Sequence, residues 1–306
     1  MTERATEPTG GRVSGANLGG PSVVAIGGGH GLERTLGAAR RYASQITAVV
    51  SVADDGGSSG RLRRALDIPA PGDVRRALAA LLPDETPLGN ALNYRFEAGE
   101  LAGHAFGNLL LAALTAELGD FVAALAEACR ILGTVGDVLP ATTHPVTLCA
   151  TVSGRPVEGQ VAIMAERDIS HVTLDPPDAA APGAVLDAIA AADQVVVGPG
   201  SLYTSLLAAL VPIGVTDAIA SSNARRVYVA NLNEQIPETA GYDVGRHLLA
   251  LAAHGFVPDV VLVDPRSMPI GAIPDGVELR VGALAGSNGA VHDEVLLAEI
   301  LAAASQ

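Results

Sequence analysis

The most informative absence in this sequence is lysine, because all 19 basic residues of the 306-residue chain are arginine. Without lysine the chain has no phosphate-binding lysine of the Walker type, no Schiff-base lysine and no kinase-type lysine. The Tyr-x-x-x-Lys pair of one large class of NAD(P)-dependent oxidoreductases is absent as well. The composition therefore excludes the enzyme classes whose chemistry depends on a lysine amine.

Positive charge is scarce in general, since 33 acidic residues against 19 arginines leave a formal net charge of −14. Nucleic acid and anionic membrane surfaces would be repelled by such a chain, so neither is expected as its main partner. An anionic small ligand must then be held locally, by backbone N–H groups and a few arginines.

Cysteine and aromatic residues are also rare. Aromatic residues make up 3% of the chain and hydrophobic residues 49%, which predicts a core of alanine, valine, leucine and isoleucine. Cys129 and Cys149 lie among apolar residues without ligand-like spacing, so we expect two buried thiols rather than a disulfide or a metal pair. Buried thiols, and the lack of an apolar signal-peptide core near the N-terminus, predict a cytoplasmic location.

One uncharged stretch, residues 195–216, is about as long as a membrane span. It contains three glycines and two prolines, which interrupt a membrane helix. We therefore predict a strand, a loop and a buried helix for this stretch, and no membrane insertion.

The stretch 23–36, VVAIGGGHGLERTL, is the feature around which we expect the rest of the chain to be built. An apolar strand (23–26) meets a helix (32–41) through a turn that contains Gly27, Gly28, Gly29, His30 and Gly31. A helix that starts directly after such a turn leaves N–H groups free, and with the helix dipole they form a site for phosphate. The dinucleotide fingerprint is only approximated, since its last glycine is replaced by Leu32. An ordinary tight turn is the alternative.

A second apolar strand is predicted over residues 46–52 and ends in an acidic loop. Asp54 and Asp55 follow it directly, in the order expected of a nucleotide-binding βαβ unit. The two carboxylates could accept ribose hydroxyls or hold Mg²⁺ through oxygen, and a plain turn is the alternative. Arg61 and Arg64 share a helix face that either meets phosphate or is solvated, and Asp73 is placed to cap the next helix.

Short β-like runs lie between about residues 138 and 175, where we expect a small β insertion. The runs are 146–152, 160–164 and 171–174, and Ser153-Gly154-Arg155 is a hairpin-turn signal. His144 and His171 are expected to pack rather than coordinate metal, because no HxH or HExxH spacing occurs. The sequence therefore requires no transition metal.

A second glycine-rich turn, which contains Gly198 and Gly200, joins a strand (194–197) to a helix (202–210). Ser201 either caps that helix or donates to a phosphate, and Tyr203 lies in its first turn. Farther along, Asn231 opens a long polar loop (231–242) at the carboxyl end of a strand, where open α/β sheets place their ligands.

The remaining pattern alternates helices with strands and predicts an α/β fold. We expect a Rossmann-like, mostly parallel sheet with helices on both faces and the small β insertion. Residues 1–20, rich in glycine, threonine and serine, are expected to form a disordered tail, and residues 21–306 a single domain. Asn108, near the start of an apolar helix (109–117), either caps that helix or reaches into the cleft.

Together these motifs resemble the YvcK-like gluconeogenesis factor family, a branch of the CofD-like superfamily. The strings that carry the resemblance are AIGGGHGL (25–32), VADDGGSSGRL (52–62), PGDVR (71–75), FGNL (106–109), GPGSLYTS (198–205) and the loop 231–242. They span nearly everything from residue 23 to 264. His30 stands where many relatives carry threonine, so one hydroxyl contact to phosphate is either lost or replaced by an imidazole.

The resemblance implies a cytoplasmic protein that binds a nucleotide sugar, in particular a UDP-sugar, supports cell shape on gluconeogenic carbon sources and forms a homo-oligomer. In this hypothesis the first glycine turn and Ser201 hold the diphosphate, and Asp54 or Asp55 holds ribose or sugar hydroxyls. The loop 231–242 closes over the ligand. The expected ligand-binding residues are Gly27, Gly28, Gly29, His30, Gly31, Asp54, Asp55, Asn108, Gly198, Gly200, Ser201, Tyr203, Asn231, Thr239 and Tyr242.

The CofD branch implies a different function class, a transferase that moves a phospho-organic acid onto a deazaflavin. In that case a deazaflavin hydroxyl attacks phosphorus, and Mg²⁺ on Asp54 and Asp55 stabilises the developing charge. Only this hypothesis makes the two aspartates catalytic and requires a metal. An NAD(P)-dependent oxidoreductase is the third hypothesis, disfavoured by the glycine spacing and the missing lysine.

Overall fold

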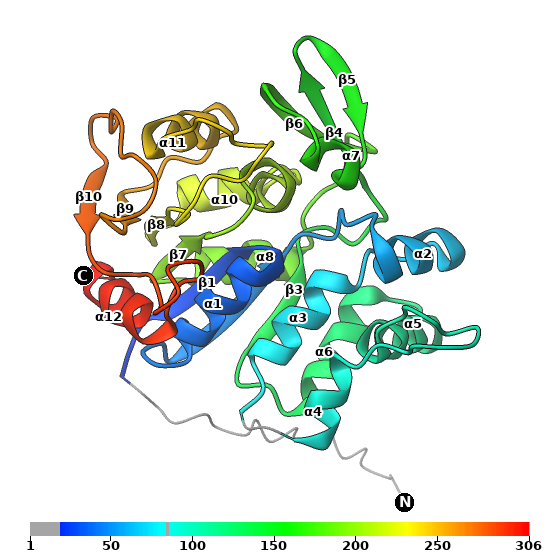
Figure 1. Cartoon of the computed structure of the whole chain (residues 1–306). Helices are drawn as coiled ribbons and strands as arrows, with labels where there is room; N and C mark the ends of the chain where they lie inside the picture. Colours follow the sequence, from blue (N-terminus) through cyan, green and yellow to red (C-terminus); the bar gives the residue numbers. More distant parts are fainter. Residues whose placement is uncertain (1–18, 84–85, 306) are drawn as a thin grey trace, which may run out of the picture.

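A seven-stranded parallel sheet forms the centre of the molecule (Figure 1). The computed structural model describes residues 19–83 and 86–305. The strand order is β10-β9-β8-β7-β1-β2-β3, and every pairing within this sheet is parallel. The predicted α/β fold with a mostly parallel sheet is thus confirmed. Residues 1–18 of the expected N-terminal tail lie outside the described residues.

The strands of this sheet are short and mostly apolar. They are β1 (Ser22–Gly27), β2 (Gln45–Val50), β3 (Asp137–Pro140), β7 (Gln194–Val197), β8 (Arg225–Val229), β9 (Val260–Val263) and β10 (Glu278–Val281). The strands β7 and β9 are buried along their whole length. Continuous apolar runs of this kind are typical of parallel strands that are covered on both faces.

Helices connect the strands and cover the sheet. They are α1 (Gly29–Ala39), α2 (Gly57–Leu66), α3 (Gly72–Ala80), α4 (Pro87–Leu92), α5 (Phe106–Leu118), α6 (Phe121–Leu132), α8 (Gly183–Ala190), the π-helix η1 (Leu202–Leu207) with α9 (Ala208–Leu210), α10 (Val215–Ser221), α11 (Val244–Ala253) and α12 (Glu294–Ala304). Figure 1 shows α1 next to both α3 and α12, with which it packs.

The strand order reverses between β1 and β7. The strands β2 and β3 are added on one side of β1, whereas β8, β9 and β10 are added on the far side of β7. Because parallel crossovers are right-handed, these opposite directions place α1 on one face of the sheet and η1 to α10 on the other. Ligands of open α/β sheets bind at the carboxyl ends of the strands where the order reverses. Both glycine turns lie at this point, since they follow β1 and β7.

A separate antiparallel sheet projects at the top right of Figure 1. It consists of β4 (Thr147–Val152), β5 (Arg155–Glu158) and β6 (Ile169–Asp175) in the order β5-β4-β6. The predicted hairpin turn is confirmed, because Val152 pairs with Arg155 across Ser153 and Gly154. Both turn residues have positive φ, 48° and 80°, as a tight two-residue hairpin turn of type I′ requires.

Two predictions about this insertion are wrong. Residues 137–140 form β3, an edge strand of the main sheet, instead of opening the insertion. Residues 160–164 form the helix α7 (Gln160–Met164) and not a strand. A carboxylate far away in the sequence explains the helix, because Asp55 accepts a hydrogen bond (3.1 Å) from the N–H of Val161 in its first turn.

Other predictions concern burial and membrane insertion. Residues 195–216 form β7, the second glycine turn, η1 and α9 as predicted. Among the helices of residues 19–83 and 86–305, none is long and apolar enough to cross a membrane. Cys129 and Cys149 are free thiols, but both are half-buried rather than fully buried.

Candidate functional site

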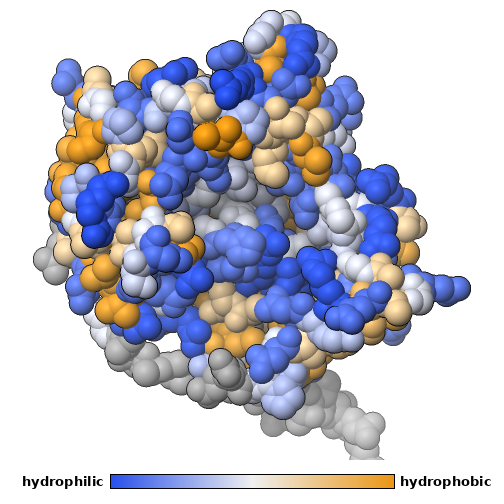
Figure 2. All heavy atoms as spheres, viewed as in Figure 1, coloured by the Kyte–Doolittle hydropathy of each residue, from blue (hydrophilic) through white to orange (hydrophobic). Residues whose placement is uncertain are grey.

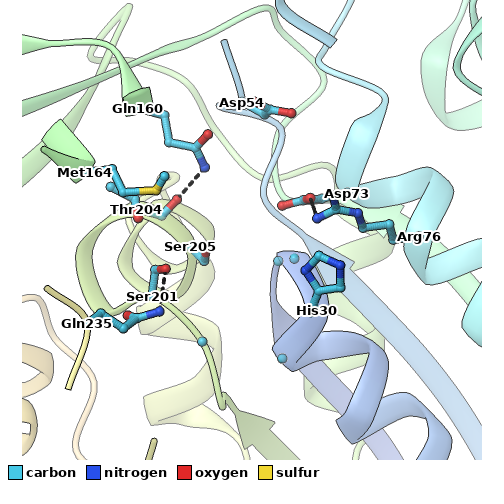
Figure 3. Close-up of a pocket in the computed structure, with 14 residues that line it drawn as sticks. His30, Asp54, Asp73, Arg76, Gln160, Met164, Ser201, Thr204, Ser205 and Gln235 are labelled. Atoms are coloured by element: carbon cyan, nitrogen blue, oxygen red, sulfur yellow. Dashed lines mark hydrogen bonds and ion pairs between the residues drawn. The ribbon is translucent and has the colours of Figure 1, made fainter. Parts of the chain in front are cut away.

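The two glycine turns face each other across a cavity of about 370 Å³ at the carboxyl ends of β1 and β7 (Figure 3). Figure 3 shows His30, Asp73 and Arg76 on one side of it, with Ser201, Thr204 and Ser205 on the other. The space-filling view is hollowed near its centre (Figure 2). The full lining consists of Gly28, Gly29, His30, Gly31, Asp54, Asp73, Arg76, Gln160, Met164, Gly200, Ser201, Thr204, Ser205 and Gln235.

The close approach of the two turns depends on a missing side chain. A Cβ atom on Gly31 would lie 2.0 Å from the carbonyl oxygen of Pro199, so only glycine lets α1 pack against the second turn. The hydroxyl of Thr35, one turn further along α1, donates to the carbonyl oxygen of Gly198 at 2.6 Å. These contacts fix the distance between the two sides of the cavity.

The start of α1 supplies the free N–H groups of the cavity. Its N-cap, Gly28, is extended and offers no side chain to the first turn. The amide of Gly29 donates to Asp73. Within the part of the chain that the structure describes, the amides of His30 and Gly31 have no hydrogen-bond acceptor. Together with the helix dipole they can bind an anion.

In the second turn, by contrast, side chains already occupy most of the amides. Asn231 accepts a hydrogen bond from the N–H of Gly200 and donates one to its carbonyl oxygen, both at 2.9 Å. The buried carboxylate of Glu238 accepts from the N–H groups of Tyr203 (2.8 Å) and Thr204 (3.4 Å). The amides of Gly200, Tyr203 and Thr204 are therefore not available to a ligand.

The second turn presents hydroxyl groups to the cavity. Ser201 does not cap the following helix, and its hydroxyl instead accepts a hydrogen bond from the side-chain amide of Gln235 at 2.9 Å. Ser205 lines the cavity one turn later. The helix that carries these hydroxyls is a π-helix, a rare conformation that occurs frequently at functional sites.

Two carboxylates border the cavity on the side of α3, and they are Asp54 and Asp73 rather than the neighbours Asp54 and Asp55. Asp54 accepts a hydrogen bond from the N–H of Gly56 at 2.9 Å. A Cβ atom on Gly72 would lie 2.9 Å from the second oxygen of Asp54, so glycine makes room for this carboxylate. Asp55 does not line the cavity, since its carboxylate is bonded to α7.

Asp73 is a functional candidate that the sequence analysis did not identify. It was expected as a helix cap, but Pro71 is the N-cap of α3 and Asp73 is its second residue. The carboxylate lies over the first glycine turn, where a Cβ atom on Gly28 would come within 2.5 Å of it. The pKa of Asp73 is raised to about 6, chiefly by burial and also by the charge of Asp54, against the lowering effect of Arg76 at 3.5 Å. The only sequence signal for this residue was the string PGDVR.

A smaller cavity of about 200 Å³ adjoins the first and shares Asp54, Asp73 and Arg76 with it. The buried guanidinium of Arg75 lies at its wall and donates to the amide oxygens of Asn108 (3.1 Å) and Asn93. Burial, and the nearby charges of Arg76 and Arg95, lower the pKa of Arg75 to about 10.

Asn108 is the third residue of α5, and the N-cap of that helix is Ala105. Asn108 was expected either to cap this helix or to reach into the cleft, and the structure places it at the wall of the smaller cavity. Its amide nitrogen donates to the hydroxyl of Ser58 at 3.1 Å, while its oxygen accepts from Arg75. This amide links the starts of α2 and α5 to α3.

Several of the expected ligand-binding residues lie outside both cavities. Gly27 and Gly198 are at the strand ends behind them, and Tyr203, Thr239 and Tyr242 are buried. The hydroxyls of the two tyrosines are 3.1 Å apart. From the loop 231–242 only Gln235 lines the main cavity. Asn231, Leu232, Glu238, Thr239 and Tyr242 are buried, whereas Asn233, Glu234, Ile236 and Gly241 are exposed.

The other residues that sequence reasoning missed come from α3, α7 and η1: Arg76, Gln160, Met164, Thr204 and Ser205. Gln160 donates to the carbonyl oxygen of Thr204 at 2.9 Å and joins the insertion to the cleft. Arg61 and Arg64, which were expected either to meet phosphate or to be solvated, are exposed and line neither cavity. No group of three or more metal-ligating side chains occurs among the residues described.

Comparison with known proteins shows which family the chain resembles. The model of the family described as "2-phospho-L-lactate transferase CofD" matches residues 23–281. The "Putative gluconeogenesis factor" of Mycobacterium tuberculosis (strain H37Rv) is 48% identical over 263 residues, which cover 81% of this chain and 77% of the relative. The "Gluconeogenesis factor" of Halalkalibacterium halodurans is 44% identical over 247 residues, 79% of this chain and 77% of that protein.

The chain is also similar to a solved structure. The crystal structure of a protein of the UPF0052 family from Bacillus halodurans superposes with a TM-score of 0.86 and is 37% identical in sequence. The match covers 92% of this chain and 98% of the other.

Proposed function

The chain belongs to the CofD family, and from this membership we propose that it acts as a gluconeogenesis factor whose cleft binds a nucleotide sugar. The ligand is a UDP-sugar, and the protein supports cell shape during growth on gluconeogenic carbon sources. Binding, rather than turnover, is the activity that we assign to it.

The observation that carries this proposal is the position of the free α1 amides opposite the hydroxyls of Ser201 and Ser205. A diphosphate can accept hydrogen bonds from both sides at once, and the α1 dipole favours its charge. The volume of about 370 Å³ lies in the range of small-ligand sites, about 300–1,000 Å³. Asp54 and Asp73 offer carboxylate acceptors to the hydroxyls of a sugar next to the diphosphate.

Calorimetric titration with UDP-N-acetylglucosamine and UDP-glucose tests this assignment. His30 is exposed at the start of α1, so His30→Glu places a negative charge beside the proposed diphosphate without disturbing the core. We expect at least a tenfold loss of affinity, about 1.4 kcal/mol. His144→Glu is the matched control, because His144 is also exposed and lies outside the cavities. A folded protein that gives no binding heat with either nucleotide would contradict the proposal.

The cellular role requires a separate experiment. In a bacterium whose gluconeogenesis factor has been deleted, the wild-type chain should restore normal cell shape on a gluconeogenic carbon source. The His30→Glu variant should fail and the His144→Glu variant should succeed, since only the former changes the proposed binding site. If both variants restored cell shape equally, the cellular role would not depend on ligand binding at this site.

One observation favours a second candidate function, a phosphoryl-type transferase like the one that names the family model. Asp54 and Asp73 stand together at the cavity, and Mg²⁺ is commonly held by one or two carboxylates with phosphate oxygens completing its shell. These two residues would hold the ion, which neutralises charge that develops on phosphate. Metal-dependent transfer onto a deazaflavin that is lost in Asp54→Asn would favour the enzyme, and no product with matched substrates would exclude it.

A further inference from the structure

The smaller cavity, named here the arginine cavity, is not needed for a diphosphate at the glycine turns. It lies where α2, α3 and α5 meet (Figure 1). Its lining consists of Asp54, Gly56, Gly57, Ser58, Ser59, Gly72, Asp73, Arg75, Arg76, Arg95 and Asn108. Three arginines around one small cavity are unusual in a chain with a net charge of −14.

Arg75 is the residue that points to a ligand. Arg75 is only 4% exposed, yet no carboxylate of the described residues lies within 4 Å of its guanidinium. Its hydrogen-bond acceptors are the neutral amides of Asn93 and Asn108. The carboxylates of Glu33 and Asp73 favour its charge from a distance, but neither forms an ion pair with it. A buried cation without a direct ion pair destabilises the fold, and a bound anion would supply the missing partner.

The fold makes room for this arginine. A Cβ atom on Gly107 would lie 2.8 Å from Cγ of Arg75, so glycine at this position lets the side chain pass along the start of α5. Asn108 then holds its Nε, and Ser58 holds Asn108. The arginine is thus oriented by α5 and, through Asn108, by α2.

Further donors surround the same cavity. The helix α2 begins there with Gly56 as its N-cap and without a side-chain cap, so the amides of its first turn are free of helical partners. Arg95 approaches from the loop before α5 and is exposed at the mouth. The carboxylates of Asp54 and Asp73 line the part shared with the main cavity, whereas Arg75, Arg95 and the start of α2 line only the smaller one.

We propose that the arginine cavity binds a second anionic group, a carboxylate or a phosphate, beside the diphosphate at the glycine turns. Guanidinium groups and helix-start amides match the oxygens of both groups. The group is either part of the bound nucleotide sugar, as in a sugar acid, or a separate small anion. The position beside a diphosphate rests on the proposed function, whereas anion binding itself does not.

Two nucleotide sugars that differ only at C6 test the first source. UDP-glucuronate carries a carboxylate where UDP-glucose carries a hydroxymethyl group. We expect wild-type protein to bind UDP-glucuronate at least tenfold more tightly in calorimetry. Arg95→Gln should reduce this advantage to less than threefold, because it removes one cation at the exposed mouth. Arg64→Gln, an exposed arginine of α2 outside the cavity, should leave the advantage unchanged.

Inorganic phosphate tests the second source. Thermal unfolding is followed with phosphate added to protein alone and to protein saturated with UDP-glucose. A separate anion predicts a rise of at least 2 °C in melting temperature that Arg95→Gln abolishes and Arg64→Gln retains. Arg75→Gln should behave like Arg95→Gln if it folds, and the exposed Arg95 variant suffices if it does not.

The outcomes distinguish this inference from the proposed function. Neither a carboxylate advantage nor a phosphate effect that depends on Arg95 would overturn the inference, even if UDP-glucose binds. A phosphate effect that depends on Arg95 without any binding of UDP-glucose would support the anion site and contradict the nucleotide-sugar assignment. Failure of every probe would overturn both.

Discussion

Replacing Asp73 by asparagine should stabilise the ligand-free protein, and the gain should grow with pH. Burial raises the pKa of this carboxyl from 3.8 to about 6 in the folded state. The folded state therefore binds the proton more tightly than the unfolded chain. The protonated carboxyl contributes its full stabilisation below about pH 3.8, and this contribution is lost as the pH rises through about 6.

The magnitude follows from the two pKa values. Ionising Asp73 in the folded state lowers the free energy of unfolding by about 3 kcal/mol at pH 8 but by only about 1 kcal/mol at pH 4.5. Asparagine has nearly the same shape, carries no charge at either pH and keeps an oxygen that can accept from the amide of Gly29. Asp73→Asn should therefore gain about 2 kcal/mol more at pH 8 than at pH 4.5.

Urea unfolding at the two pH values measures this difference. The chain has no tryptophan, so the transition is followed by far-ultraviolet circular dichroism, in EDTA and without nucleotide. Asp187→Asn, on the exposed side of α8, is the control and should change the free energy of unfolding little at either pH. An equal gain for Asp73→Asn at both pH values, or a loss at pH 8, would refute the reasoning about the buried carboxyl.

Three further substitutions test how the cleft is built. Gly31→Ala forces a methyl group into the carbonyl of Pro199. It should lower the free energy of unfolding, measured with urea, by about 1–3 kcal/mol and weaken binding of UDP-glucose. An unchanged unfolding midpoint would contradict the contact. Asn231→Asp removes the donor to the carbonyl of Gly200 and should lower the free energy of unfolding by about 1–3 kcal/mol at neutral pH, whereas unchanged stability would show that this bond is dispensable. Asp55→Ala removes the acceptor at the start of α7 and should accelerate amide exchange there while β1 and β7 stay protected; slow exchange in α7 would rule out this anchoring role.

Local sequence rules predicted the elements whose signals lie within the elements themselves. Such local signals also mark α6, because Asp120 caps its start and Gly133 takes the left-handed conformation at its end. The strand over 194–197 has the predicted bounds. The glycine turns were recognisable because a strand, glycines and a helix follow one another directly along the chain.

The features that could not be predicted depend on contacts between distant segments. Residues 160–164 look like a short strand, but they form a helix whose first turn is bonded to the carboxylate of Asp55, more than a hundred residues earlier. Glu238 lies in a polar loop, and nothing local indicates that it would reach the amides of Tyr203 and Thr204. The role of Asp73 was hidden for the same reason, because a cap and a cleft carboxylate have the same local sequence.

The pairing of β1 with β7 also has a consequence for biosynthesis. Val23 pairs with Gln194, so the strand that completes the cleft leaves the ribosome long after its partner. At a translation rate of about 5–20 residues per second, the delay is roughly 10–30 s. During this interval one edge of β1 lacks its neighbour and can pair with another nascent chain. A polypeptide released before residue 194 retains the first glycine turn but lacks the opposite wall of the cavity.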